Sequence, residues 1–172
     1  MAASPLPGEK SRLDEKKLEA VTRLFEQTVE AREKTKKRKA VFVSWCERNP
    51  LNSYLVEDLI DPFLITLGFD VHYYRKDKLL GIPNDVIHSI QESCEITIAF
   101  YTRDDDDRPA GNVIKETDRI APNRKVVFYE EGVDVESMTR AEALCISFSR
   151  EKYGELLLRL VEVLTKNQLL SV

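Results

Sequence analysis

Residues that cross-link a chain or interrupt its regular structure are scarce in this sequence. Its 172 residues include three cysteines, six glycines and seven prolines. Cys46, Cys94 and Cys145 are odd in number and widely spaced, and no CxxC pair or histidine stands at ligand spacing. We therefore expect reduced, structural thiols in a cytoplasmic protein, without a disulfide framework or a cysteine-bound metal. The low glycine and proline content also excludes collagen-like and linker-like proteins.

Long apolar runs are missing as well. No run approaches the roughly 20 residues that span a bilayer, and the start, MAASPLPGEKSR, has no apolar segment of a secretory signal. We therefore expect no membrane partner. Hydrophobic residues still make up 42% of the chain and charged residues 33%. This composition supports one hydrophobic core, and the length fits one domain with an appendage.

Positive charge is scarce outside the first part of the chain. Residues 1–39 hold 11 basic and 7 acidic side chains, a net of +4, and the remainder holds 15 and 23, a net of −8. An acidic globular part does not suggest a nucleic-acid surface. The one basic run, Lys34–Lys39, is typical of a solvated helix end, where cations oppose the negative end of the dipole.

The chain divides into three parts. Residues 1–8 carry two prolines and a glycine, and we expect them to be disordered. Residues 9–38 are expected to form one helix whose narrow apolar stripe packs on the domain or pairs with another copy of itself. The stripe consists of Leu13, Leu18, Val21, Leu24, Phe25 and Val29. Residues 39–169 form the predicted domain.

Five short apolar runs within that domain alternate with amphipathic segments. The predicted strands are Ala40–Trp45, Phe69–Tyr74, Ile96–Thr102, Lys125–Tyr129 and Leu144–Phe148. The predicted helices are Asn52–Leu67 (kinked or split at Pro62), Asn84–Ser93, Gly111–Ile120, Val135–Ala143 and Arg150–Leu169. This alternation predicts an α/β fold, a five-stranded parallel doubly wound sheet of flavodoxin-like order with an extra N-terminal helix.

In such a sheet, ligands bind beyond the carboxyl ends of the strands, where the strand order reverses. The loop after the third strand leads into the segment GNVIKE, in which Asn112 and Glu116 are four residues apart and share one helix face. We expect the helix dipole to keep Glu116 ionised beside the crevice. An ionised carboxylate there could stabilise or attack an oxocarbenium-like sugar centre. The alternative is a surface acid that only satisfies the dipole.

The same loop and its neighbours offer further candidates. Asp104–Asp107 could bind a metal, but four consecutive acids cannot all converge, so we favour a solvated loop tip and expect no metal. Arg75 and Lys76 could hold phosphate groups, and Trp45 or Tyr74 could stack on a ring. Equally, the second loop could be an ordinary connection and Trp45 a packing residue. Cys46 has no histidine partner at a recognisable spacing, and no GxSxG elbow is present.

The order of these motifs resembles a Toll/interleukin-1 receptor (TIR) domain of the prokaryotic or TIR-like nucleotide-binding type. AVFVSW resembles the family's opening strand, and Asp77–Ser93 resembles its BB loop and following helix. EITIAFYT resembles the third strand, and GNVIKE resembles the start of the helix that carries the glutamate of NAD-cleaving members. Where those members often have tryptophan, this chain has Asn112, which is closer to TIR-like nucleotide-binding proteins and similar to nucleoside deoxyribosyltransferases.

The resemblance implies an NAD glycohydrolase that cleaves the nicotinamide–ribose bond, with Glu116 as the catalytic residue and NAD as substrate rather than cofactor. Because nicotinamide leaves as an already cationic ring, one carboxylate can suffice where most glycosidases need two. The expected substrate-binding residues are Ser44, Trp45, Tyr74, Arg75, Lys76 and Asn112.

The resemblance also implies assembly into homo-oligomers through the Asp77–Ile82 loop and a role in immune defence or signalling. Two alternatives remain open: a non-catalytic TIR interaction module, and a nucleotide N-glycosidase of deoxyribosyltransferase type.

Overall fold

The computed structural model of this chain describes residues 23, 38–79, 81–103 and 111–170. Its contacts separate residues 1–38 from a compact unit, Lys39–Val172. The predicted disorder of residues 1–8 and the predicted helix over 9–38 lie outside the described residues, apart from Arg23 and Arg38.

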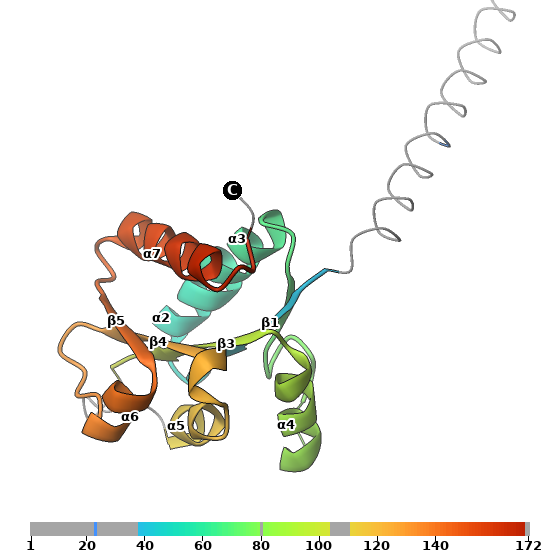
Figure 1. The fold of residues 1–172 in the computed structure, drawn as a ribbon, viewed down its shortest axis with the longest axis horizontal. Coiled ribbons are helices and arrows are strands. Elements are labelled where there is room, and N and C mark those ends of the chain that lie inside the picture. Colours follow the sequence, from blue (N-terminus) through green and yellow to red (C-terminus); the bar gives the residue numbers. More distant parts are fainter. Residues whose placement is uncertain (1–22, 24–37, 80, 104–110, 171–172) are drawn as a thin grey trace, which may run out of the picture. The chain divides into compact units, whose positions relative to one another are not determined.

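A five-stranded parallel sheet forms the centre of the compact unit (Figure 1). Its strands are β1 (Ala40–Ser44), β2 (Asp70–His72), β3 (Ile96–Tyr101), β4 (Lys125–Glu130) and β5 (Leu144–Phe148). Their order is β2-β1-β3-β4-β5, and every pair is parallel. This confirms the flavodoxin-like sheet predicted from the sequence. The order reverses between β1 and β3, so these two strands flank the switch point.

Helices cover both faces of the sheet. They are α2 (Pro50–Ser53), η1 (Tyr54–Ile60), α3 (Asp61–Thr66), α4 (Asn84–Ser93), α5 (Gly111–Asp118), η2 (Pro122–Arg124), α6 (Ser137–Glu142) and α7 (Tyr153–Lys166). Helices α2, α3 and α7 lie on one face, and α4, α5 and α6 lie on the other (Figure 1). Among the described residues, no helix is both long and apolar enough to cross a bilayer.

The helix expected over Asn52–Leu67 extends from Pro50 to Thr66 in three consecutive pieces, and the middle piece, η1, is a π-helix. The backbone N–H of Asp61 donates to the carbonyl oxygen of Val56, five residues earlier. Pro62, the second residue of α3, has no N–H to donate. The local change in hydrogen bonding thus accommodates Pro62 without breaking the helix.

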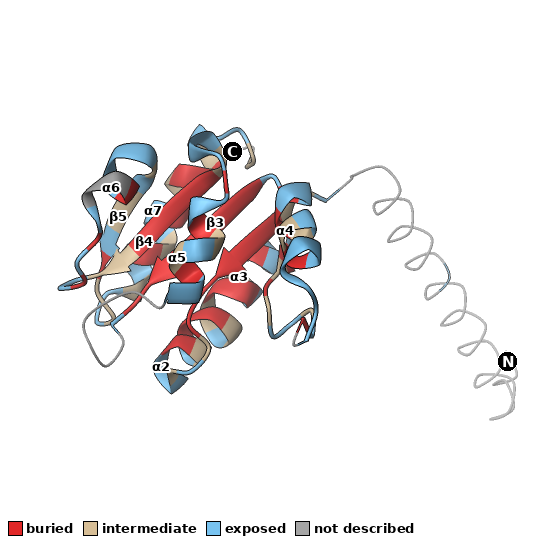
Figure 2. Ribbon diagram, turned by 90° about the horizontal axis from the view of Figure 1, so that it is seen from below, coloured by how far each residue is buried: buried red, intermediate tan, exposed pale blue. Residues whose placement is uncertain are grey.

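The core is built from strand residues that alternate between the two faces of the sheet. In β1 and the two residues after it, Val41, Val43 and Trp45 join the cluster under α3 and α7, while Phe42 and Cys46 join clusters on the opposite face. The most buried strands are β1, β3 and β4, in the middle of the sheet, and Figure 2 shows β3 and β4 largely in red. By this alternation the side chain of Ser44 belongs to the face that carries α4 and α5.

Candidate functional site

The carboxyl of Glu116 lies at the switch point of the sheet. Ser44 is the last residue of β1, and its hydroxyl donates a hydrogen bond to Oε2 of Glu116. Helix α5, which carries Glu116, follows β3 in the chain and packs against both β3 and β1. Two of the predicted site residues, distant in sequence, thus meet where the topology places a ligand site.

Burial governs the electrostatics of Glu116. Loss of hydration raises the pKa of its carboxyl above the ordinary value, and the charge of Glu47 raises it further. The hydrogen bond from Ser44 and the charge of Arg119 act in the opposite direction. From the sequence we expect the helix dipole to keep this carboxyl ionised; the largest influence on its pKa is instead burial, which acts in the opposite direction. Glu116 is the sixth residue of the eight-residue α5, and the dipole effect fades beyond the first turn.

Arg75 is held by two acidic side chains of the same chain. Its backbone N–H donates to Oε1 of Glu47 over 2.8 Å, and its Nη2 donates to the backbone oxygen of Glu47 over 3.0 Å. Its Nη1 also reaches both carboxylate oxygens of Glu57 at 3.3 Å. Its Nε also lies 3.7 Å from Oε2 of Glu47, so a phosphate group that binds Arg75 must compete with two carboxylates.

Trp45 and Lys76 also have partners within the chain. Trp45 is 3% exposed, with the edge of Tyr73 at a centroid distance of 6.0 Å and the guanidinium of Arg75 5.4 Å from its ring centre. Lys76 donates to Asp61 over 2.7 Å, and the hydroxyl of Tyr73 donates to the other oxygen of that carboxylate over 3.1 Å. Stacking of a ligand ring on Trp45 would require Arg75 to move.

The predicted site residues therefore divide between the two faces of the sheet. Ser44 and Glu116 lie on the face of α4 and α5, and the half-buried Tyr74 packs beside the Phe42 cluster on that same face. Trp45 belongs to the core cluster of the opposite face. Asn112 is exposed in α5, one turn before Glu116. Both groups can meet only beyond the carboxyl edge of the sheet.

Two polar residues that the sequence pattern did not single out contact this site. Glu47, in the loop after β1, raises the pKa of Glu116 and binds Arg75. Gln91, on α4, donates to the backbone oxygen of Glu116. A signal for Gln91 exists in the sequence, since it lies four residues after the buried Ile87 on the apolar face of its helix. For Glu47 no pattern in the sequence distinguishes it from the other loop acids.

Within the described ranges, no group of three or more histidine, cysteine or acidic residues is arranged to hold a metal ion. The run Asp104–Asp107 lies outside the described residues. None of Cys46, Cys94 and Cys145 takes part in a disulfide.

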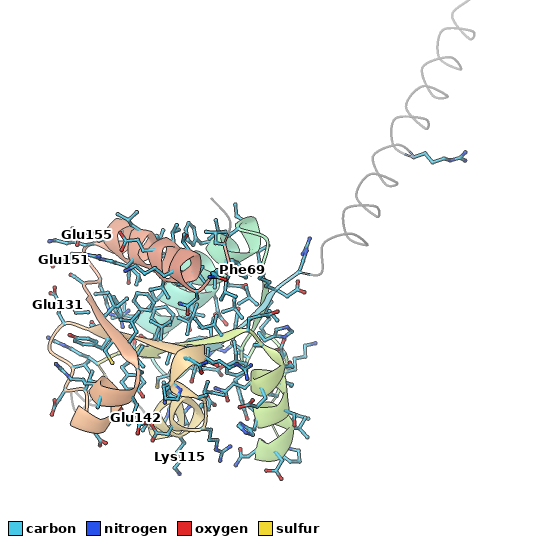
Figure 3. All side chains as sticks on the ribbon, viewed as in Figure 1. Phe69, Lys115, Glu131, Glu142, Glu151 and Glu155 are labelled. Carbon is cyan, nitrogen blue, oxygen red and sulfur yellow. The ribbon has the colours of Figure 1, made fainter. Side chains whose placement is uncertain are left out.

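A cavity of about 500 Å³ lies elsewhere, beside the edge strand β5 and helix α7. Its lining includes Tyr129, Cys145, Ser149 and Arg159, and none of the predicted site residues contributes to it. Figure 3 shows the acidic side chains of Glu131, Glu151 and Glu155 along that side of the molecule.

Comparison with known proteins adds no identification. No protein-family model matches the chain, and no curated protein matches it either.

Proposed function

We propose that this chain is a TIR-family NAD glycohydrolase that cleaves the bond between nicotinamide and ribose, with Glu116 as the catalytic residue. One observation carries the proposal: the carboxyl of Glu116 meets Ser44 at the end of β1, at the switch point of a flavodoxin-like sheet. The order of the TIR-like motifs supports it independently.

The electrostatics of Glu116 suit a cationic substrate. A carboxylate whose pKa is raised by lost hydration gains most from a positive charge placed beside it. In NAD the nicotinamide ring is cationic, and positive charge passes to the ribose carbon as the bond breaks. Glu116 would stabilise that centre while water or another nucleophile adds to it, and Ser44 would hold the carboxylate in place.

The test is to incubate the full chain with NAD at high protein concentration and to follow nicotinamide by chromatography. We expect turnover by the wild-type chain and a loss of at least about a hundredfold in Glu116→Gln, since the charge that stabilises the transition state is gone. Turnover that survives Glu116→Gln would refute this residue's role. Faster cleavage of nucleoside monophosphates than of NAD would select the deoxyribosyltransferase type.

Glu142→Gln is the matched control. It makes the same chemical change on α6, where Glu142 is exposed (Figure 3). We expect it to retain wild-type turnover, so that any loss in Glu116→Gln is specific to the site.

A second candidate function is a non-catalytic TIR module that binds like domains through the Asp77–Ile82 loop. A specific observation favours it: Ile82 is 39% exposed and Val86, on the adjoining first turn of α4, is 46% exposed. Neighbouring exposed apolar side chains are typical of a contact surface. In addition, Arg75 and Lys76 are already paired within the chain.

Sedimentation analysis tests this candidate. If it is correct, the wild-type chain self-associates without consuming NAD, and Val86→Asp shifts it to monomer. Ile65→Asp places the same charge on α3, at a residue that is also 46% exposed, and should leave the association unchanged. Equal effects of the two variants would contradict a specific surface at the loop.

A further inference from the structure

Two buried side chains from separate elements hold the backbone of α5 next to the candidate catalytic carboxyl. Gln91, on α4, is 2% exposed, and its side-chain amide donates to the backbone oxygen of Glu116 over 3.0 Å. Lys125, at the start of β4, is 5% exposed, and its Nζ donates to the backbone oxygen of Thr117 over 3.2 Å. The last turn of a helix leaves its carbonyls without intrahelical donors. Gln91 supplies a donor to the carbonyl of Glu116, and Lys125 adds a second donor to that of Thr117, which also accepts from the backbone N–H of Ile120 over 3.2 Å.

Filling the space at positions 91 and 125 does not require polar side chains. A buried amide or ammonium loses its hydration and must recover it through hydrogen bonds, whereas an apolar side chain would fill the same space without that cost. The side-chain amide of Gln91 also donates to Oγ1 of Thr97, over a longer 3.4 Å. Both side chains aim at consecutive carbonyls of α5 and so fix its rotation and its position along its axis.

Glu116 is therefore held at two levels. Gln91 and Lys125 fix the backbone of its helix turn, and Ser44 fixes its carboxyl. A shift or rotation of α5 would break the contact with Ser44 and move the carboxyl relative to the end of β1. Catalysis is sensitive to such movement, because a misplacement of about 1 Å can cost on the order of a hundredfold in rate.

We propose that Gln91 and Lys125 are positioning residues for Glu116, which hold α5 so that its carboxyl meets Ser44 at the switch point. The catalytic consequence rests on the proposed NAD glycohydrolase function. Because both residues act through Glu116 rather than on the substrate, their loss lowers kcat and leaves KM nearly unchanged.

The first experiment compares two variants in NAD turnover. Gln91→Met removes the amide and keeps the length of the side chain, and we expect kcat to fall about tenfold with KM within about twofold. Thr97→Val is the matched control, because it removes only the other partner of Gln91 and should retain wild-type kcat. Equal losses in the two variants would assign Gln91 a merely structural role and overturn the proposal.

Lys125 provides a second series. Lys125→Met removes the donor to Thr117 and keeps the aliphatic chain, so we expect a loss of kcat similar to that of Gln91→Met. Lys125→Arg keeps an N–H donor and should recover most of the lost rate. Thermal melts establish that both variants are folded. If Lys125→Met and Lys125→Arg then have the same kcat, the hydrogen bond to Thr117 does not position Glu116.

An NMR titration of the Glu116 carboxyl tests the positioning role of Gln91 without depending on NAD cleavage. With ¹³C-labelled glutamate, and Glu116→Gln to identify the signal, the midpoint depends on burial and on the neighbouring Ser44, Glu47 and Arg119. We expect Gln91→Met to lower the midpoint toward the ordinary value as the carboxyl gains water, and Thr97→Val to leave it unchanged.

A wild-type chain that does not cleave NAD would end the proposed function, and the titration would still decide the positioning role. An unchanged midpoint in folded Gln91→Met would overturn it. If Gln91→Met does not fold, Gln91→Asn replaces it, since the shorter side chain keeps the amide but withdraws it from the Glu116 carbonyl.

Discussion

At the scale of single residues, Glu116 is a carboxyl that the fold makes harder to ionise. Its pKa is raised chiefly by burial and further by Glu47, and the Ser44 hydroxyl offsets only part of this. In the unfolded chain the same carboxyl has its ordinary pKa. Between the two pKa values the folded state therefore binds more protons, and stability falls as pH rises through this window. At pH values above the folded-state pKa, the carboxyl is charged in both states and the whole cost of burying the charge lowers the free energy of unfolding.

Because the buried charge lowers stability at high pH, we expect Glu116→Gln to stabilise the fold at neutral and alkaline pH. The amide removes the buried charge and still offers an oxygen to the Ser44 hydroxyl. We expect the free energy of unfolding in urea to rise at about pH 8, and the gain to disappear as pH falls below the ordinary pKa of a glutamate, where the carboxyl is protonated in both the folded and the unfolded chain.

The control is again Glu142→Gln, whose exposed carboxyl should give no comparable gain at either pH. A loss of stability in Glu116→Gln at about pH 8 would contradict the expected sign. It would mean that the carboxylate is stabilised where it lies, by contacts stronger than its lost hydration.

Sequence reasoning selects both Ser44 and Glu116, because each stands where a predicted strand or helix borders the predicted crevice. It does not anticipate the direction of the Glu116 pKa shift. That direction depends on how deeply α5 packs against β1 and on the proximity of Glu47, and neither follows from periodicity. The pairing of Arg75 with Glu47 and Glu57 likewise depends on the tertiary structure and could not be predicted from local sequence, because the partners lie 28 and 18 residues away.

At the scale of elements, the turn after β4 depends on a glycine. Gly132 has a φ of +88°, and a Cβ added there would collide with the guanidinium of Arg103. That guanidinium donates to the backbone oxygen of Glu131 through Nε over 2.9 Å and through Nη2 over 2.6 Å. An added methyl group would therefore strain the backbone and displace Arg103 from the turn.

We expect Gly132→Ala to lower the free energy of unfolding by about 1–2 kcal/mol. Gly154→Ala is the matched control, because Gly154 lies in α7 with no heavy atom within 4 Å of an added Cβ and no positive φ. There alanine should stabilise the protein by up to about 1 kcal/mol. Chemical denaturation measures both, and equal effects of the two variants would contradict a special role for Gly132.

A second element-scale feature is a polar network that ties the carboxyl ends of several strands together. Arg150, just after β5, binds Glu130 at the end of β4 over 2.8 Å and Asn52 of α2 over 2.6 Å. Asn52 in turn donates to the backbone oxygen of Cys46 over 3.0 Å and to Oγ1 of Thr102 over 2.8 Å. The network therefore links the segments that follow β1 and β3 to β4 and β5.

Removing the cation should damage this network severely. We expect Arg150→Met to lower the free energy of unfolding by about 3 kcal/mol, because Glu130 is left as a largely buried and unpaired charge. Arg159→Met makes the same change at an exposed ion pair with Glu162 and should cost less than about 1 kcal/mol. Urea unfolding distinguishes the two, and similar losses would show that the network adds nothing beyond a surface pair.

The elements themselves follow closely from the sequence pattern. The predicted strand Leu144–Phe148 and the predicted helix Asn84–Ser93 have the bounds of β5 and α4. Strong periodicity and clear turn residues explain that agreement. The π-helical turn in η1 could not be predicted, because periodicity indicates that a segment is helical but does not say which carbonyl each N–H reaches. The position of Pro62 signals only that the helix is disturbed.

At the scale of the whole molecule, the sheet order was predictable because alternating strands and helices with right-handed crossovers leave few topologies. The division of the predicted ligand residues between the two faces was not. It follows from the alternation of side chains along β1 and the residue after it, since Ser44 and Trp45 lie on opposite faces of the sheet and a one-residue shift would exchange them. Many activities use this fold, and the site distinguishes them.

The architecture also predicts where the independently folding unit begins. Lys39 donates through Nζ to the backbone oxygens of Gln168 and Leu169, over 2.9 and 3.2 Å, just beyond the end of α7. The backbone N–H of Ala40 donates to Glu95 over 2.6 Å. The contacts of Lys39 join the start of the unit to its carboxyl-terminal segment. Every core cluster of the described residues lies within this unit.

We therefore expect a chain of residues 39–172 to unfold cooperatively, within a few degrees of the full chain. A chain of residues 41–172 is only two residues shorter, but it lacks Lys39 and Ala40 and leaves the carboxyl end of α7 without its cation, so it should melt several degrees lower. Circular dichroism at a common protein concentration compares the three. If the 39–172 chain melts without cooperativity, residues 1–38 contribute to the core, and the division of the chain at residue 38 is wrong. If the two short chains melt together, the contacts of Lys39 do not close the unit.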